Sequence, residues 1–225
     1  MSNMKSYSVI TKMIIGWVLA LLSSGCVGLI IPPYGFVASD ARRITEPGRD
    51  IVMPENAPSI SQGYNPQVTE TEGIIIILGH NGIDIIHNKG TPVMAAAAGC
   101  VIRSSYGPFY GHQIIIDHGP DPAGRIFRSK YLHLEKRLVR EGDVLIRGQC
   151  IGTMGRTGLL AGFTHLHYEI LRSSPQDMQV FASANPHRFW ADGVGVVTCF
   201  DKNRHWPDRP FGATYPVPCR GVDWQ

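Results

Sequence analysis

The sequence predicts a mainly β fold, namely a compact antiparallel β-sandwich or barrel-like sheet with only short helices. Gly and Pro, at 25 and 16 of the 225 residues, interrupt the chain too often for long helices. The β-branched runs are short and bounded by Gly, which is typical of strands. Hydrophobic residues make up 44% of the chain and charged residues 17%, a balance that can bury one core.

The expected strands begin after a stretch without regular period. Residues 73–78 (GIIIIL) form a short apolar block, and residues 82–86 repeat its character with Asp84 among isoleucines. Turns separate most of the later runs, which favours antiparallel neighbours. Those later strands are expected at residues 93–103, 113–118, 128–134, 144–153 and 166–171, and one short helix at residues 186–190.

An apolar segment precedes the predicted domain. Residues 13–31 carry no charge and approach the roughly 20 apolar residues that a bilayer-spanning helix needs. Lys5 and Lys12 precede it, which favours an N-terminus in the cytoplasm and the remainder of the chain on the far side. Small residues before Cys26 also resemble a lipoprotein signal, although Ser23 stands where that pattern usually has Leu. An uncut anchor, lipidation at Cys26 and a cleaved signal peptide therefore remain three alternatives.

All three alternatives predict the same localisation for the folded domain, outside the cytoplasm in the periplasm or at the cell surface. The first two also make the membrane a partner of the N-terminal segment. The formal net charge is +3, and the Lys and Arg residues are scattered along the chain. Without a basic stripe, a nucleic-acid-binding function is excluded.

Four segments are expected along the chain. They are a membrane anchor or lipoprotein-type signal at residues 1–31, an extended stalk at 32–67, the folded domain at 68–192 and a C-terminal extension at 193–225. Cys199 and Cys219 lie in the Pro-rich extension and are predicted to form a disulfide, because disulfides persist outside the cytoplasm. Cys100 and Cys150 lie in apolar runs and are expected to be inert buried thiols.

Three short motifs gather the side chains that could perform chemistry: GHNGID at residues 79–84, YLHL at residues 131–134 and THLHYEI at residues 164–170. Alternate residues of a strand share a face, so His165 and His167 point the same way. His80 and Asp84 also share a face if their segment is extended. Imidazole and carboxylate groups suit zinc, and three protein ligands leave a fourth position for water. The chain has no HExxH motif, which excludes a thermolysin-like glutamate base.

Six segments, taken in order, form a specific set. They are GHNGIDII, KGTPVMAAAAGCVI, IIIDHG, YLHL, EGDVLIRGQCIGTMGRTG and THLHYEIL, and they cover residues 79–186. This set resembles the LytM/lysostaphin-type zinc metallopeptidases, a family of peptidoglycan endopeptidases with a duplicated hybrid motif fold. The resemblance implies a metalloendopeptidase that uses one Zn²⁺ to hydrolyse peptide cross-links of peptidoglycan, with peptidoglycan peptides as its partner.

The resemblance also implies a role for each residue of the motifs. His80, Asp84 and His167, the second histidine of the HxH pair, would bind the metal. His133 and His165 would be the catalytic histidines that do not bind zinc. A neutral imidazole accepts a proton from water and its protonated form stabilises a developing oxyanion, so these roles agree with the chemistry of the residues.

Two departures from the family pattern are expected to border the substrate groove. One is an insertion at residues 120–130, where the family often has a tight hairpin, and the other is the tail at residues 193–225. Loops at the rim of a site influence the choice of substrate more than the chemistry.

Two other functions compete with hydrolysis. A non-catalytic member of the same family would activate another cell-wall hydrolase, with a regulatory protein as its partner. Degenerate members should lack zinc ligands, whereas all three are present here. A biotinyl or lipoyl carrier domain shares the pattern GTPVMAAAAGCVI followed by EGDVLIRGQCIG, yet no lysine stands in a Met-Lys-Met-like turn between them. The carrier likeness therefore concerns the fold alone.

Overall fold

The computed structural model describes residues 51–71, 74–175, 177–207 and 210–225. The predicted anchor or signal at residues 1–31 lies outside the described residues, as do residues 32–50 of the predicted stalk. Among the described residues, no helix combines the length and the apolar character that a membrane span requires.

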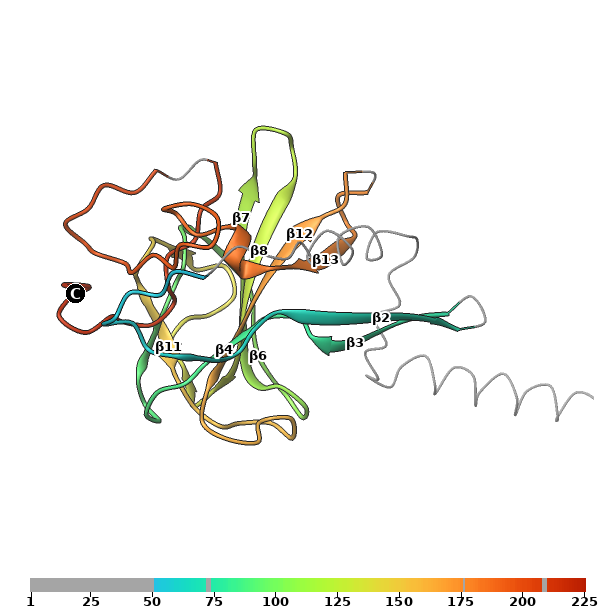
Figure 1. Cartoon of the computed structure of the whole chain (residues 1–225), viewed down its shortest axis with the longest axis horizontal. Helices are drawn as coiled ribbons and strands as arrows, with labels where there is room; N and C mark the ends of the chain where they lie inside the picture. The colour runs from blue at the N-terminus through green and yellow to red at the C-terminus, as the bar shows by residue number, and fades with distance from the viewer. Residues whose placement is uncertain (1–50, 72–73, 176, 208–209) are drawn as a thin grey trace, which may run out of the picture. The chain divides into compact units, whose positions relative to one another are not determined.

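Within these ranges the chain forms short and medium-length strands almost throughout (Figure 1). The strands are β1 (Ile60–Gln62), β2 (Asn65–Thr71), β3 (Ile74–His80), β4 (Ile83–Ile85), β5 (Pro92–Met94), β6 (Gly99–Gly107), β7 (Gly111–Pro120), β8 (Ile126–Leu134), β9 (Lys136–Arg137), β10 (Val144–Leu145), β11 (Cys150–Thr153), β12 (Leu166–Ser173) and β13 (Phe181–Ala184). The helical element of the described part is one turn of 3-10 helix at Pro186–Arg188. The prediction of a mainly β, antiparallel fold is confirmed.

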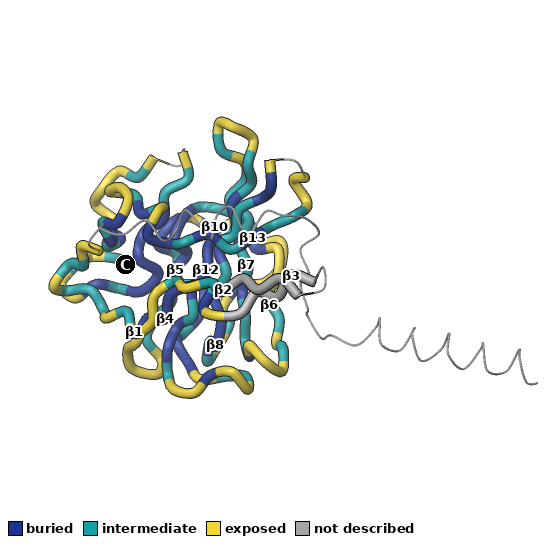
Figure 2. Tube along the Cα trace, turned by 45° about the vertical axis from the view of Figure 1, so that its right-hand side comes forward, coloured by how far each residue is buried: buried dark blue, intermediate teal, exposed yellow. Residues whose placement is uncertain are grey.

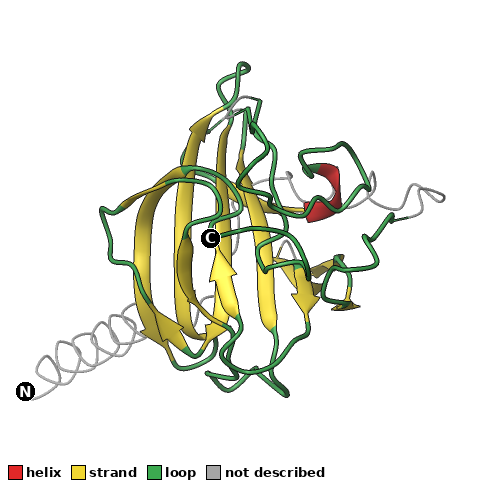
Figure 3. Ribbon diagram, turned by 90° about the vertical axis from the view of Figure 1, so that its left-hand side faces the viewer, coloured by secondary structure: helices red, strands yellow, loops and turns green. Residues whose placement is uncertain are grey.

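The strands pair antiparallel in a main sheet, a smaller sheet and a separate hairpin. The main sheet has the order β1–β4–β12–β8–β7–β6–β10, and β13 pairs with the second half of β12. Figure 3 shows its long strands running side by side. The smaller sheet has the order β5–β11–β9. Strands β2 and β3 form the hairpin, in which Asn65 lies opposite His80.

The hydrophobic core covers one face of the main sheet, which we call the core face. Alternation along β12 completely buries Leu166, Tyr168 and Ile170, and Ile83 and Ile85 of β4 are equally inaccessible. Side chains of the smaller sheet and of the C-terminal tail complete this core, which Figure 2 shows as the buried centre of the tube. The intervening residues of β4 and β12 point to the opposite face, which we call the site face.

Two predicted strands are each divided in the structure. The run at residues 93–103 becomes β5 and β6, and the run at residues 144–153 becomes β10 and β11. The two interruptions lie side by side, because Ala95 N–H donates to the Gln149 carbonyl at 2.9 Å and the Ala95 carbonyl accepts from Gly148 N–H at 2.8 Å. Gly148 has a φ of 78°, a left-handed conformation that glycine adopts at little cost.

The predicted stalk is wrong for residues 51–67. Strand β1 lies in that range and pairs with β4, and Val52 forms a bridge with Val196. The Tyr64 hydroxyl donates to the Ser183 carbonyl at 3.1 Å. A segment without a regular hydrophobic period can be ordered by contacts with distant residues, which its own pattern does not reveal.

The C-terminal tail, predicted as an extension, contributes to the core. Tyr215 and Val217 are fully buried, and the Tyr215 hydroxyl donates to the Pro58 carbonyl at 2.7 Å. A boundary at residue 192 therefore does not separate the tail from the domain. In the structure Cys199 and Cys219 are joined as a disulfide with their Cα atoms 5.9 Å apart.

Cys100 and Cys150 are free thiols. Both are partly accessible, in contrast to the predicted burial. Each is close to the end of a strand, since Cys100 is the second residue of β6 and Cys150 the first of β11. Strand ends are less covered than strand centres, which explains the difference.

Candidate metal centre

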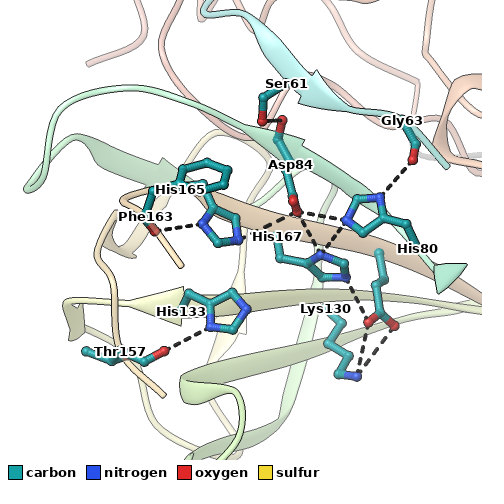
Figure 4. A network of polar contacts seen from close by, with 11 residues as sticks. Ser61, Gly63, His80, Asp84, Lys130, His133, Thr157, Phe163, His165 and His167 are labelled. Carbon is teal, nitrogen blue, oxygen red and sulfur yellow. Dashed lines mark hydrogen bonds and ion pairs between the residues drawn. The ribbon is translucent and has the colours of Figure 1, made fainter. Parts of the chain in front are cut away.

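The three ligands implied by the resemblance come from three strands that meet on the site face (Figure 4). His80 is the last residue of β3, Asp84 the middle residue of β4, and His167 the second residue of β12. Antiparallel pairing sets His167 directly opposite Asp84. Their apolar neighbours along both strands point into the core, so alternation turns these two side chains away from it.

The donor atoms of these residues converge. Asp84 Oδ1 lies 2.9 Å from His80 Nε2 and 2.8 Å from His167 Nδ1, and the two nitrogens are 3.0 Å apart. In a tetrahedral zinc site with bonds of about 2.0–2.1 Å, ligand atoms are about 3.3 Å apart. Two imidazoles and a carboxylate are also ligands that zinc prefers. The residues therefore fit one Zn²⁺ after a separation of a few tenths of an ångström.

Each ligand histidine is oriented through its other ring nitrogen. His80 Nδ1 donates to the Gly63 carbonyl at 2.7 Å, and His167 Nε2 lies 3.1 Å from Glu169 Oε1. Such partners fix the tautomer and the ring orientation of a metal ligand. Sequence reasoning missed both. The i, i+2 spacing of Glu169 after His167 is a signal that could have found it, whereas no local pattern points to Gly63.

His133 and His165 stand beside the three ligand residues (Figure 4). Their ring centroids are 4.8 Å apart, and His165 Nε2 lies 3.7 Å from Asp84 Oδ1. Nδ1 of His133 donates to the Thr157 carbonyl, and Nδ1 of His165 donates to the Phe163 carbonyl, both at 2.9 Å. A carbonyl oxygen only accepts, so in the neutral form each ring keeps Nε2 as an unprotonated acceptor.

The backbone of His133 is unusual. Its φ is 63°, and among the residues that the structure describes His133 is the one non-glycine residue with a positive φ. Left-handed backbone costs a non-glycine residue about 1–2 kcal/mol, and such strain clusters at functional sites. The conformation is held by the hydrogen bond from the His133 backbone N–H to the Tyr110 carbonyl at 3.0 Å. Strand alternation therefore does not decide where this imidazole points.

Electrostatics separate the roles of these side chains. Burial alone would raise the pKa of Asp84, but hydrogen bonds from His167 and His80 lower it well below its usual range. Burial alone would lower the pKa of His167, but hydrogen bonds to Asp84 and Glu169 raise it to about 9. Burial, reinforced by the neighbouring imidazoles, lowers the pKa of His133 to about 4. His133 is thus neutral at pH 7 and able to accept a proton.

The turn of the insertion at residues 120–130 lies away from the ligands, which corrects the expectation that this turn borders the groove, whereas the last residue of the insertion, Lys130, reaches Glu169 beside His167. Its turn joins β7 to the start of β8, whereas His133 is near the end of β8. On β12, Arg172 pairs with Phe127 and His167 pairs with Leu132. Five residues of strand at roughly 3.3 Å each correspond to about 17 Å. The C-terminal tail packs into the core on the core face, so the expectation that it borders the groove on the site face is corrected as well.

Part of the chain is similar in sequence to known proteins. Residues 78–180 match the model of Peptidase family M23. Peptidoglycan DD-endopeptidase ShyC of Vibrio cholerae serotype O1 is 44% identical over 113 residues, which cover 50% of this chain and 24% of that protein. Lysostaphin of Staphylococcus staphylolyticus is 30% identical over 158 residues, covering 68% of this chain and 30% of that protein.

A third relative has a different name. Murein hydrolase activator NlpD of Salmonella dublin is 41% identical over 93 residues, which cover 41% of this chain and 23% of that protein.

The solved catalytic domain of lysostaphin from Staphylococcus simulans superposes with a TM-score of 0.43 at 29% identity, over 57% of this chain and 89% of that chain. The chain spans less than a third of the length of the three curated relatives.

The matched region contains all five side chains that the structure brings together, from His80 to His167. It also contains the ordered motifs on which the resemblance was based. Residues 78–180 are therefore a domain of peptidase family M23, the LytM/lysostaphin type.

Proposed function

We propose that this chain is a zinc-dependent metalloendopeptidase that hydrolyses peptide cross-links of peptidoglycan. One observation carries the proposal. Two imidazole nitrogens and a carboxylate oxygen converge within 3.0 Å of one another, beside two further imidazoles whose Nε2 atoms are free to accept a proton. The similarity to a relative named peptidoglycan DD-endopeptidase supports this choice of substrate.

The chemistry follows from the two sets of side chains. His80, Asp84 and His167 would hold the zinc ion, which would act as a Lewis acid toward the scissile carbonyl and the attacking water. One of the two imidazoles, His133 or His165, accepts the proton of the attacking water at Nε2 and returns it to the leaving amine. In its protonated form, an imidazole at this position also stabilises the negative charge that develops on the carbonyl oxygen.

We further propose that the domain works outside the cytoplasm, attached to the membrane through the N-terminal segment. The apolar residues 13–31 and the preceding lysines support this orientation. A disulfide between Cys199 and Cys219 would persist in that compartment. The mass of the purified mature protein tests the mode of attachment, because an intact segment from Met1 to Cys26 is incompatible with lipidation at Cys26.

A second candidate function is that of a non-catalytic activator of another cell-wall hydrolase, with that hydrolase as a protein partner. The 41% identity to a relative named murein hydrolase activator favours it. The complete set of three converging donors and two neighbouring imidazoles favours the enzyme, because an activator has no use for a metal-ligand geometry of this kind.

Chromatography of peptides released from purified cell-wall sacculi separates the two candidates. The full chain is assayed with zinc, with a chelator and as the variants His167→Ala and His87→Ala. His87 is an exposed histidine that serves as the matched control. An endopeptidase removes cross-linked peptides only with zinc and with His167 intact, and His87→Ala leaves the rate unchanged. Absence of cleavage by a folded, zinc-loaded chain would favour the activator.

A further inference from the structure

The four histidines around the metal centre differ in what holds their second ring nitrogen. His80, His133 and His165 each donate from Nδ1 to a backbone carbonyl, at 2.7–2.9 Å. His167 is held by a side chain, since its Nε2 lies 3.1 Å from Glu169 Oε1. A carboxylate accepts a stronger hydrogen bond from an imidazole than a neutral carbonyl does. Of the two histidine ligands, His167 therefore has a carboxylate as its hydrogen-bond partner, whereas His80 has a backbone carbonyl.

We propose that Glu169, held by Lys130, is a positioning residue of the metal centre: it keeps the His167 proton on Nε2 and the Nδ1 lone pair directed at the metal. The inference rests on the zinc site of the proposed function. Glu169 does not touch substrate or metal in this role and acts only through His167.

The strand geometry makes this contact directional. Glu169 follows His167 by two residues in β12, so both side chains lie on the site face. Glu169 is 7% exposed, and a buried carboxylate is stable only when it is paired. Its pair is Lys130 of β8, which lies directly opposite in the register and places Nζ 3.3 and 3.4 Å from the two carboxylate oxygens.

A glycine of the GHNGID motif leaves room for this arrangement. A Cβ atom added at Gly82 would collide with the Tyr168 carbonyl oxygen, and it would lie 3.0 Å from both Glu169 Cγ and His167 Nε2. These distances are shorter than ordinary van der Waals contact, so a side chain at Gly82 would push the two groups out of place. The backbone at Gly82, just before β4, therefore packs closely against the hydrogen bond between His167 and Glu169.

The structural consequence concerns the orientation of one ring. An imidazole can present either nitrogen to a metal after a flip of its ring or a change of tautomer. Nδ1 of His167 lies 2.8 Å from Asp84 Oδ1, so this nitrogen points to the place where the three predicted ligands converge. Without an acceptor for Nε2–H, the alternative states of the ring become accessible and compete with metal binding. Loss of such a partner typically costs about 10–100-fold in metal affinity.

The zinc dissociation constant of the full chain in detergent, measured by competition with a chromophoric chelator, tests the inference. Glu169→Met removes the acceptor at similar size, and we expect about 100-fold weaker binding. Glu169→Gln keeps an acceptor oxygen and should restore part of the affinity, to about 10-fold weaker than wild type. The matched control is Asp117→Asn, which breaks another cross-strand ion pair of the same sheet, 2.9 Å from Arg128, and should leave zinc affinity unchanged.

The ring proton of His167 gives a second readout that a merely structural ion pair would not change. In the zinc-loaded wild type, the Nε2–H signal in proton NMR should exchange slowly with water, and in Glu169→Gln it should exchange faster. Zinc affinity within twofold of wild type in a folded Glu169→Met variant overturns the inference. If Glu169→Met does not fold, a zinc affinity of Glu169→Gln equal to that of the wild type overturns the inference instead.

The experiment also keeps this inference apart from the proposed function. Zinc affinity is measured without any substrate, so the series can hold in a chain that does not cleave peptidoglycan. Equally, an unchanged affinity overturns the role of Glu169 while wall cleavage that depends on zinc and His167 leaves the enzyme assignment intact.

Discussion

His118 and His167 are histidines of the same antiparallel sheet, yet their surroundings shift the imidazole pKa in opposite directions. Burial lowers the pKa of His118 to about 4, and this ring donates from Nδ1 to Ala98 O and accepts at Nε2 from Ser129 Oγ. Burial acts on His167 too, but hydrogen bonds to Asp84 and Glu169 outweigh it and raise the pKa to about 9.

The difference follows from the face of the sheet on which each histidine lies. His118 is on the face of Ile114 and Ile116, which are fully buried in the core. There a histidine is stable only as a neutral group with both ring nitrogens satisfied. On the site face, carboxylates surround His167 and favour its charged form, or a metal in place of the proton. The two faces therefore use one residue type for stability and for chemistry.

The largest expected effect belongs to the site face. His133→Ala should lower the rate of wall-peptide cleavage about 10²–10⁴-fold, because it removes a neutral imidazole that accepts the proton of water. Zinc content should remain that of the wild type, since His133 is not among the converging donors. Cleavage assays combined with metal analysis measure both, and a rate within threefold of wild type would contradict the role of His133.

The core face should respond in stability instead. Ile170 is fully buried three residues after His167, and Ile170→Ala should lower the free energy of unfolding by about 2–5 kcal/mol. Zinc affinity of the folded fraction should not change. Val144, which is highly exposed, provides the control, and Val144→Ala should stay within about 0.5 kcal/mol. Chemical denaturation decides, and equal losses in both variants would remove the distinction between core and surface.

The disulfide should also contribute to the stability of the fold and not to zinc binding. Replacing Cys199 and Cys219 by Ser frees a loop of 20 residues and should lower the free energy of unfolding by about 3 kcal/mol. Zinc affinity should again be unchanged, because the tail packs in the core. A peptide map of the non-reduced protein provides the prior check, and two free thiols in the wild type would contradict the predicted bond.

The smallest expected effect is a pH dependence of stability caused by His118. Its pKa in the folded state, about 4, is below the unfolded value of about 6.5, so its contribution is complete above pH 6.5 and is lost as the pH falls towards 4. At pH 5 the loss is at most about 2 kcal/mol. His118→Asn should flatten the profile of unfolding free energy between pH 6.5 and 4. An identical profile in both proteins would show that His118 does not titrate in this way.

The candidate site could be predicted to the extent that its pattern is local. The HxH spacing indicated a shared face for His165 and His167, and the ordered motifs identified the family. Glu169 stands in the same motif, but its partner Lys130 is 39 residues earlier in the chain. The left-handed backbone of His133 was equally hidden, because it depends on a hydrogen bond to the carbonyl of Tyr110, in the turn between β6 and β7.

By itself, the sequence determined the mainly β fold, the alternation that separates apolar from polar side chains along β12, and the five residues that gather at the site. These features depend on side-chain period, turn residues and ordered motifs, which are local properties of the chain. Only the tertiary structure decided that β4 lies between β1 and β12, that residues 51–67 are ordered and that the tail fills the core. The reason is that pairing between distant strands depends on the combined packing of many residues, whereas each segment's own pattern is compatible with several partners.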